Sequence, residues 1–132
     1  MKLITRDTDY AIRALIFMAQ HKETKTSVSE MVRELKIPCP FLRKILQILN
    51  KKKILKSYKG QGGGFLLATP ANRIFLVDLI EIFQGPLKIN ECLLKKRTCP
   101  DAPTCVLKKK IQYIEEYIVS KLDSINVASL LN

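Results

Sequence analysis

The chain has 132 residues, of which 47% are hydrophobic, and a formal net charge of +11 at pH 7. This length and apolar content predict one domain with a buried core and exclude a wholly disordered chain. No segment approaches the ~18–20 continuous apolar residues of a membrane span. Charges at Arg6, Asp7 and Asp9 interrupt the apolar run that a secretion signal would need, so we expect a cytoplasmic protein. Its excess of positive charge favours a polyanionic partner, above all nucleic acid, over a basic domain without such a partner.

Residues 8–20 form the first predicted helix. Its apolar side chains recur at the i, i+3, i+4 spacing of an amphipathic helix, and they are Ala11, Ile12, Leu15, Ile16 and Ala19. A polar loop follows, and His21, the single histidine of the chain, lies at its start. We expect His21 to be exposed to solvent rather than bound to a metal.

A second helix is predicted to begin after Ser27. A serine followed three residues later by Glu30 fits a capping box, in which the serine side chain accepts a hydrogen bond from the backbone of the glutamate. The apolar face of this helix contains Met31, Val32 and Leu35. Pro38 and Pro40 then end the helix, because proline cannot continue the helical hydrogen bonds.

Residues 41–53 form a third predicted helix, with Pro40 at its first position. We expect its buried face to contain Phe41 or Leu42 together with Ile45, Leu46 and Leu49, and its exposed face to contain Arg43, Lys44, Gln47 and Lys51. Two helices joined by a tight turn, the second with a basic exposed face, are typical of a helix-turn-helix. Many helical hairpins share this pattern, so the prediction of DNA binding depends equally on the net charge.

Residues 54–59 and 65–69 are two short predicted strands on either side of a glycine-rich turn. A hairpin directly after a basic helix predicts a winged helix-turn-helix. The glycines permit positive φ and remove side-chain bulk, so the turn can approach a phosphate backbone or enter a minor groove. The alternative is a hairpin with no ligand. The residues predicted to contact DNA are Phe41, Arg43, Lys44 and Gln47 in the third helix and Tyr58, Lys59, Gly60, Gln61, Gly62 and Gly63 in the wing.

Two further helices are predicted towards the C-terminus. Residues 74–84 form the first, which ends at Gly85 and Pro86. The second has one long apolar stripe, which contains Leu107, Ile111, Ile114, Ile118, Leu122 and Ile125. Such a helix can pack on the core of its own chain or pair with the same helix of a second chain. We favour a homodimer, because helix-turn-helix proteins commonly read two half-sites as dimers.

Three of the four cysteines lie between these helices, at Cys92, Cys99 and Cys105. The C-x6-C-x5-C spacing lacks the C-x2-C pairs of a structural zinc site and suits an iron–sulfur cluster better. Zinc and a thiol-based redox switch are the alternatives, and the basic residues 95–97 favour thiolates. Cys39 stands apart, and we expect it to be a partly buried structural residue. With no C-x-x-C pair and no nucleophile beside a histidine base, the sequence predicts no enzyme.

Several segments together resemble the Rrf-type family of bacterial winged-helix transcription regulators. They are DYAIRAL in the first helix, FLRKILQILNKKKIL in the third, YKGQGGGFLLA in the wing, EIFQGPL, the three cysteines and the ending NVASLLN. The resemblance runs nearly from end to end. The fold class that we predict is mainly α with a small β-hairpin wing. A winged helix-turn-helix DNA-binding domain would cover residues 1–84, a cysteine loop 85–106, and a dimerisation helix with its tail 107–132.

The resemblance implies a homodimer that binds a palindromic operator in double-stranded DNA. It also implies that Cys92, Cys99 and Cys105 ligate a [2Fe–2S] or [4Fe–4S] cluster, although the first two are six residues apart where five is usual. Some members of the family use a histidine three residues after the last cysteine as the fourth ligand, but Lys108 occupies that position here. Others use an acidic residue of the partner subunit near the start of the first helix, which Asp9 matches, with Asp7 as a nearby substitute. The alternative is that Asp9 is a carboxylate favoured at the helix start by the helix dipole. The cluster would sense redox state, nitric oxide or cluster supply. The alternative function is a cluster-independent repressor that responds to a small molecule or a partner protein.

Overall fold

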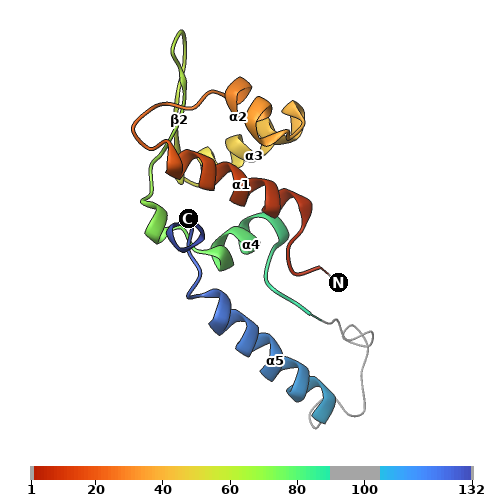
Figure 1. Ribbon diagram of the computed structural model, residues 1–132. Helices are drawn as coiled ribbons and strands as arrows, with labels where there is room; N and C mark the ends of the chain where they lie inside the picture. The colour runs from red at the N-terminus through yellow and green to blue at the C-terminus, as the bar shows by residue number, and fades with distance from the viewer. Residues whose placement is uncertain (1, 90–104, 132) are drawn as a thin grey trace.

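A computed structural model of the protein describes residues 2–89 and 105–131. The elements in chain order are α1 (Arg6–Gln20), α2 (Val28–Leu35), α3 (Cys39–Lys51), β1 (Leu55–Tyr58), β2 (Gly64–Leu67), η1 (Ala71–Arg73), α4 (Leu76–Gln84), α5 (Val106–Leu122) and η3 (Ala128–Leu130). In Figure 1, α2 and α3 lie on one side of α1 and α4 lies on the other, while the hairpin of β1 and β2 projects from the body. The prediction of a mainly helical fold with a small hairpin wing is confirmed.

Helix α1 packs against α3 and α4, and its buried face combines alanines with two larger side chains. It begins at Arg6, two residues before the predicted start. Its buried apolar residues are Ala11, Ala14, Leu15, Met18 and Ala19. Ile12 and Ile16, which were predicted to share the buried face, are only partly buried. The buried face is therefore rotated from the predicted one, with Ala14 and Met18 in place of Ile12 and Ile16.

Helices α2 and α3 form the predicted helix-turn-helix. The Ser27 hydroxyl accepts a hydrogen bond from the Glu30 backbone N–H at 3.1 Å, as a capping serine should. Helix α3 begins at Cys39, so Pro40 lies one position further into the helix than predicted. Of the two candidates for burial, Leu42 is fully buried and Phe41 is 37% exposed. Leu42 is the one whose spacing of three, four and seven residues places it on the face of Ile45, Leu46 and Leu49.

The hairpin is joined to the rest of the fold along its second strand. Strands β1 and β2 are antiparallel, with Leu55 opposite Leu67 and Tyr58 opposite Gly64. On the other side of β2, Thr26 forms a two-bond antiparallel bridge with Phe65, at N–O distances of 2.8 and 3.0 Å. A Cβ atom at Gly64 would lie 2.6 Å from the Thr26 carbonyl oxygen. Glycine at this position therefore allows the loop before α2 to pair with the hairpin.

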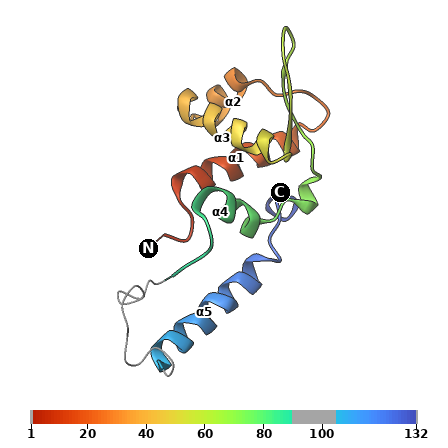
Figure 2. The same ribbon diagram turned by 180° about the vertical axis from the view of Figure 1, so that it is seen from behind.

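The C-terminal tail returns to the body of the molecule after α5. Ile74 and Phe75, predicted as helical, are extended, and α4 begins only at Leu76. The Val127 N–H donates a hydrogen bond to the Ile74 carbonyl and the Leu76 N–H donates one to the Ile125 carbonyl, which forms a bridge between Phe75 and Asn126. Val127 is 1% exposed and belongs to the main core. Helix α5 ends at Leu122, so the last residue of the predicted stripe, Ile125, lies outside it. Figures 1 and 2 both show the C-terminus beside α4 and the helix α5 extending away from the body.

Candidate DNA interface and cysteine site

The exposed face of α3 contains all the residues predicted to read DNA from this helix. Arg43, Lys44 and Gln47 are exposed, as is Phe41. The Arg43 Nε donates a hydrogen bond to the Cys39 sulfur at 3.2 Å, which joins the helix start to its next turn. Cys39 itself is partly buried, as predicted. The helix therefore presents two cations and an amide, the groups that commonly contact guanine and adenine in a major groove.

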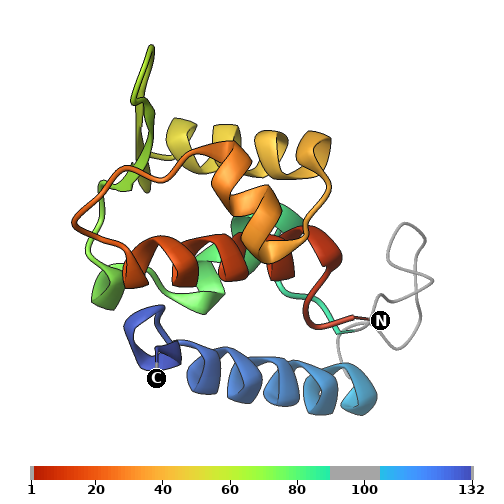
Figure 3. The same cartoon turned by 45° about the horizontal axis from the view of Figure 1, so that its top comes forward.

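The tip of the wing is open to solvent. Tyr58, Lys59 and Gln61 are exposed, and Gly60 and Gly62 have φ values of +88° and +75° with no atom within 4 Å of an added Cβ. At Gly63 an added Cβ would collide with the carbonyl oxygens of residues 58 and 60. The tight turn therefore requires glycine, and two glycines leave its outer surface bare. Figure 3 shows the hairpin and α3 on the same side of α1, so both can face one ligand.

Two cations outside the helix-turn-helix and wing contact aromatic rings within them. The guanidinium of Arg6, at the start of α1, lies 4.3 Å from the centre of the Phe41 ring. The ammonium of Lys25, in the loop before α2, lies 4.4 Å from the centre of the Tyr58 ring. Neither cation was among the predicted DNA-binding residues. No local pattern indicates them, because each contact joins residues more than thirty positions apart in the chain.

Of the predicted cluster ligands, Cys105 and Asp9 belong to the described residues, whereas Cys92 and Cys99 lie outside them. Cys105 is the N-cap of α5, and its sulfur accepts a hydrogen bond from the Lys108 backbone N–H at 3.4 Å. The thiol is free and partly exposed. The start of a helix stabilises negative charge, so a thiolate ligand fits this position.

The predicted acidic ligand lies on the first turn of α1. The Asp9 carboxylate accepts a hydrogen bond from the Arg13 Nε at 2.9 Å, and the side chains of this ion pair are 43% and 60% exposed. Such a surface pair contributes about 0–1 kcal/mol, so Asp9 can exchange it for another partner. Within residues 2–89 and 105–131, no three side chains of the metal-binding types come together. His21 is exposed as predicted, and its Nδ1 lies 2.8 Å from the Phe17 carbonyl oxygen.

Gln84, the last residue of α4, joins the end of that helix to the start of α1. Its side-chain oxygen accepts hydrogen bonds from the Thr5 backbone N–H at 2.9 Å and from the Thr8 hydroxyl at 2.6 Å. Its amide nitrogen donates to the Leu3 carbonyl oxygen at 3.2 Å. Thr8 is completely buried. These bonds tie the segment that leads towards the cysteines to the helix that contains Asp9.

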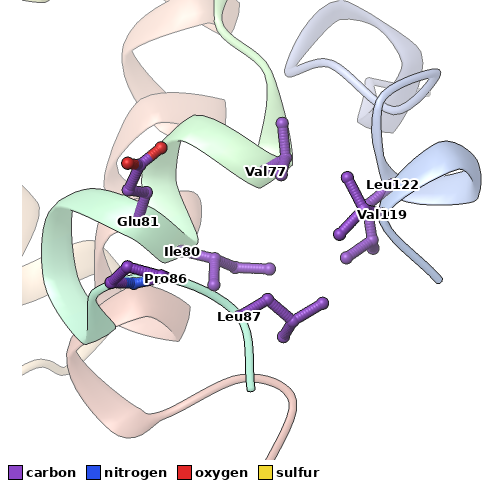
Figure 4. Close-up of a pocket in the computed structure, with 7 residues that line it drawn as sticks. All are labelled: Val77, Ile80, Glu81, Pro86, Leu87, Val119 and Leu122. Carbon is purple, nitrogen blue, oxygen red and sulfur yellow. The ribbon is translucent and has the colours of Figure 1, made fainter. Parts of the chain in front are cut away.

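A cavity of about 210 Å³ lies between α4 and α5. Its lining is mainly apolar and consists of Val77, Ile80, Glu81, Pro86, Leu87, Val119 and Leu122. Figure 4 shows Val119 and Leu122 facing the side chains of α4 and of the segment after it across this space.

Among residues 2–89 and 105–131, no helix is long and apolar enough to cross a membrane.

The fold and its exposed residues define a winged helix-turn-helix DNA-binding protein. The chain belongs to the Rrf2 family of iron-dependent transcriptional regulators, whose model matches residues 4–132. This confirms the resemblance found in the sequence. The protein is therefore a DNA-binding transcription regulator and not an enzyme.

Known proteins that are similar to the chain agree with this class. A chain of Aquifex aeolicus (strain VF5), named as an HTH-type transcriptional regulator, is 32% identical over 126 residues, which cover 93% of this chain and 87% of that protein. The structure of CymR (YrzC), the global cysteine regulator of B. subtilis, has a TM-score of 0.78 and 22% identity over 98% of this chain and 96% of that one. This likeness concerns the fold alone. The structure of IscR from T. potens has a TM-score of 0.68 and 27% identity, covering 98% of this chain and 85% of that one.

Proposed function

We propose that the protein is a homodimeric regulator in the cytoplasm whose affinity for a palindromic operator is controlled by an iron–sulfur cluster. Cys92, Cys99 and Cys105 would hold the cluster, with Asp9 of the partner subunit as the fourth ligand. A [2Fe–2S] or [4Fe–4S] cluster would supply a centre that reacts with oxidants or nitric oxide or reports cluster supply. The observation that carries the proposal is Cys105 at the N-cap of α5, with its sulfur free and partly exposed.

The position of Cys105 connects a ligand directly to a helix. A change in the ligation of its sulfur acts on the first turn of α5, because that sulfur accepts a hydrogen bond from Lys108. The cluster would also restrain the segment between Gln84 and the cysteines. Gln84 itself is hydrogen-bonded to Thr5 and Thr8 at the start of α1. Arg6 in the same first turn contacts Phe41 of α3. A series of direct contacts therefore leads from the segment before the cysteines to the helix that reads DNA.

The exposed face of α5 supports the homodimer. Leu107 is 67% exposed, Ile114 is 45% exposed and Tyr117 is 55% exposed, although they lie on a helix of 17 residues. A row of large apolar side chains in water is unfavourable, and it marks a surface that binds another protein. The same helix of a second copy has the complementary apolar face, as in a coiled coil. Two copies would then present two α3 helices to two half-sites.

Each subunit would read its half-site through α3 and the wing. Arg43 and Lys44 have the donors that pair with guanine, and Gln47 has the amide that pairs with adenine. Phe41 would contact bases through its ring. In the wing, Tyr58, Lys59, Gly60, Gln61, Gly62 and Gly63 would approach the phosphate backbone or the minor groove. Loss of the cluster would alter DNA affinity only if α3 and the wing of the two subunits are positioned differently in the cluster-bound and cluster-free protein.

The first experiment is an absorption spectrum of protein purified without oxygen, with iron and acid-labile sulfide counted per chain. We expect visible bands and about two or about four iron atoms per chain. Cys105→Ser should lose them, because serine keeps the helix cap but removes the soft sulfur ligand. Cys39→Ser is the matched control and should keep them. A colourless wild-type protein without iron, even after cluster reconstitution, would rule out the cluster mechanism.

The cavity between α4 and α5 favours a second candidate function, a cluster-independent repressor that binds a small molecule there or responds to a partner protein. Its lining is mainly apolar, but its volume of about 210 Å³ is below the roughly 300–1,000 Å³ of usual ligand pockets, so it would hold only a very small effector. The triple variant Cys92→Ser, Cys99→Ser, Cys105→Ser separates the two functions. If it keeps full DNA affinity and full regulation, the second function is correct. If regulation is lost with the cluster, the first is correct.

A further inference from the structure

The loop before α2 adds a third chain segment to the wing. Thr26 bridges Phe65 on the free side of β2. In an antiparallel arrangement, the residue before Thr26 lies opposite the residue after Phe65. The same register would bring Lys25 beside Leu66, which lies opposite Lys56 of β1. The sheet itself has two strands, and the isolated Thr26–Phe65 bridge holds the loop before α2 against its second strand.

The two faces of the sheet and the bridged loop differ in burial. Thr26 is 1% exposed and Leu55 is 2% exposed, so the face that they share is turned to the core. Side chains alternate between the faces of a sheet, which places Lys25, Lys56 and Tyr58 together on the opposite face. All three are exposed. The wing therefore has an outward face with two lysines and one aromatic ring.

Lys25 contacts the ring of Tyr58, a residue of the first wing strand. Gly64 lies opposite Tyr58 in the hairpin, and its lack of a Cβ lets the Thr26 carbonyl approach the second strand. The Lys25 ammonium lies 4.4 Å from the centre of the Tyr58 ring. Such a contact restrains an otherwise flexible lysine without neutralising its charge. In the described part of the chain the ion pairs are Arg6–Asp7, Arg13–Asp9 and Arg33–Glu34, and Lys25 belongs to none of them.

We propose that Lys25 is a phosphate-binding residue of the DNA interface, held on the outward face of the wing by Tyr58 and by the Thr26–Phe65 bridge. An ammonium group fits a phosphate oxygen, and it reads charge rather than sequence. The DNA backbone would then be contacted by two chain segments, the hairpin and the loop before α2. This adds a contact to the proposed DNA-binding set, none of whose members lies before α2.

The test compares Lys25→Gln with Lys22→Gln. Both substitutions remove one positive charge from the same exposed loop, and glutamine keeps part of the side-chain length. The probe is a DNA duplex that the wild-type protein selects from a random-sequence pool, and affinity is measured by fluorescence anisotropy between about 50 and about 200 mM salt. Thermal unfolding of each variant confirms that it folds.

Each phosphate contact contributes about 0.9 to the slope of log affinity against log salt concentration. We expect Lys25→Gln to reduce the slope by about 0.9, which corresponds to roughly eightfold weaker binding at 0.1 M salt. Lys22→Gln should leave the slope unchanged, and Lys25→Arg, which keeps the positive charge, should keep the wild-type slope. The preference for the selected duplex over a scrambled one should be the same in all variants.

Equal slopes for Lys25→Gln and Lys22→Gln would overturn the proposal, since they would show that only net charge matters. A Lys25→Gln variant that loses its preference for the selected sequence would overturn it too, because the residue would then read bases. Failure of the proposed cluster mechanism leaves this test unaffected, because the selected duplex reports on DNA contacts in whichever state the purified protein adopts.

Discussion

Helices α3 and α5 both have apolar side chains at helical spacing, but these side chains lie in opposite environments. In α3 they are buried against α1, α2 and β1, and Leu46 is completely inaccessible to solvent. In α5 only Leu122, at its end, is buried. Leu107 near its start is 67% exposed. The periodic pattern therefore identifies a face that needs a partner, and it does not say whether that partner lies in the same chain.

The difference agrees with the work that we propose for each helix. A helix that reads DNA must be held rigidly by its own domain, so that its exposed face has a defined orientation. A helix that joins two subunits must keep its apolar face available for the other copy. We make four predictions from this comparison, in order of decreasing effect.

The first prediction concerns the exposed face of α5. Ile114→Glu should remove about 3–5 kcal/mol from dimerisation, because it places an unpaired charge in the proposed apolar interface. Sedimentation should show a monomer at concentrations where the wild type is dimeric, with unchanged helix content. Ser120→Glu adds the same charge at an exposed polar position of α5 and should remain dimeric. A dimeric Ile114→Glu variant would show that α5 does not form the interface at this residue.

The second prediction concerns the buried face of α3. Leu46→Ala should lower the free energy of unfolding by about 2–5 kcal/mol, since it leaves a cavity in the core. Urea denaturation measures this loss. Leu107→Ala is the matched change on α5 and should cost less than about 0.5 kcal/mol in a monomeric background such as Ile114→Glu. Equal losses in that background would contradict the contrast between the two helices.

The third prediction concerns the close contact between Gly64 of β2 and the Thr26 carbonyl of the loop before α2. Gly64→Ala should destabilise the protein by about 1–3 kcal/mol, because its φ is +154° and the new Cβ would press on the Thr26 carbonyl. Gly60→Ala also has a positive φ but meets no atom within 4 Å, so its loss should be smaller. Urea denaturation of both variants gives the comparison. Equal losses would mean that backbone conformation alone matters and that the Thr26 contact does not.

The fourth prediction concerns a purely local contact. Ser27→Ala should cost about 1 kcal/mol, because it removes the side-chain acceptor for the Glu30 N–H. Ser29→Ala, at an exposed position of the same helix, should change stability by less than about 0.5 kcal/mol. Thermal unfolding resolves the two. If Ser29→Ala were the more damaging change, the capping assignment would be wrong.

Much of the DNA-binding half was predictable from residues close together in the chain. The capping serine, the prolines before α3 and the glycines of the wing act within a few positions of themselves. Their predicted structures are confirmed with boundaries shifted by one or two residues. The choice between Phe41 and Leu42 was left open, although Leu42 is the one spaced three, four and seven residues from Ile45, Leu46 and Leu49.

The candidate site was predictable only in part, because its geometry depends on distant segments. The ligand role of Cys105 was implied by the family resemblance, whereas its role as the cap of α5 follows from the structure. Cys92 and Cys99 lie outside the described residues, so their assignment stays a prediction. The bonds of Gln84 to Thr5 and Thr8 join positions more than seventy residues apart. No local sequence pattern predicts a hydrogen bond between such distant residues.

The sequence by itself determined the kinds of element in this protein, their order and the family to which the chain belongs. Periodicity, capping and turn residues act over one or two turns of chain, so they can be read locally. The tertiary structure alone decided that Val127 of the tail completes the core, that Lys25 lies against the wing, and that Leu107 and Ile114 of α5 stay exposed while Leu122 is buried. Burial and contacts of this kind depend on residues far apart in the chain, so they are fixed only once the whole chain has packed.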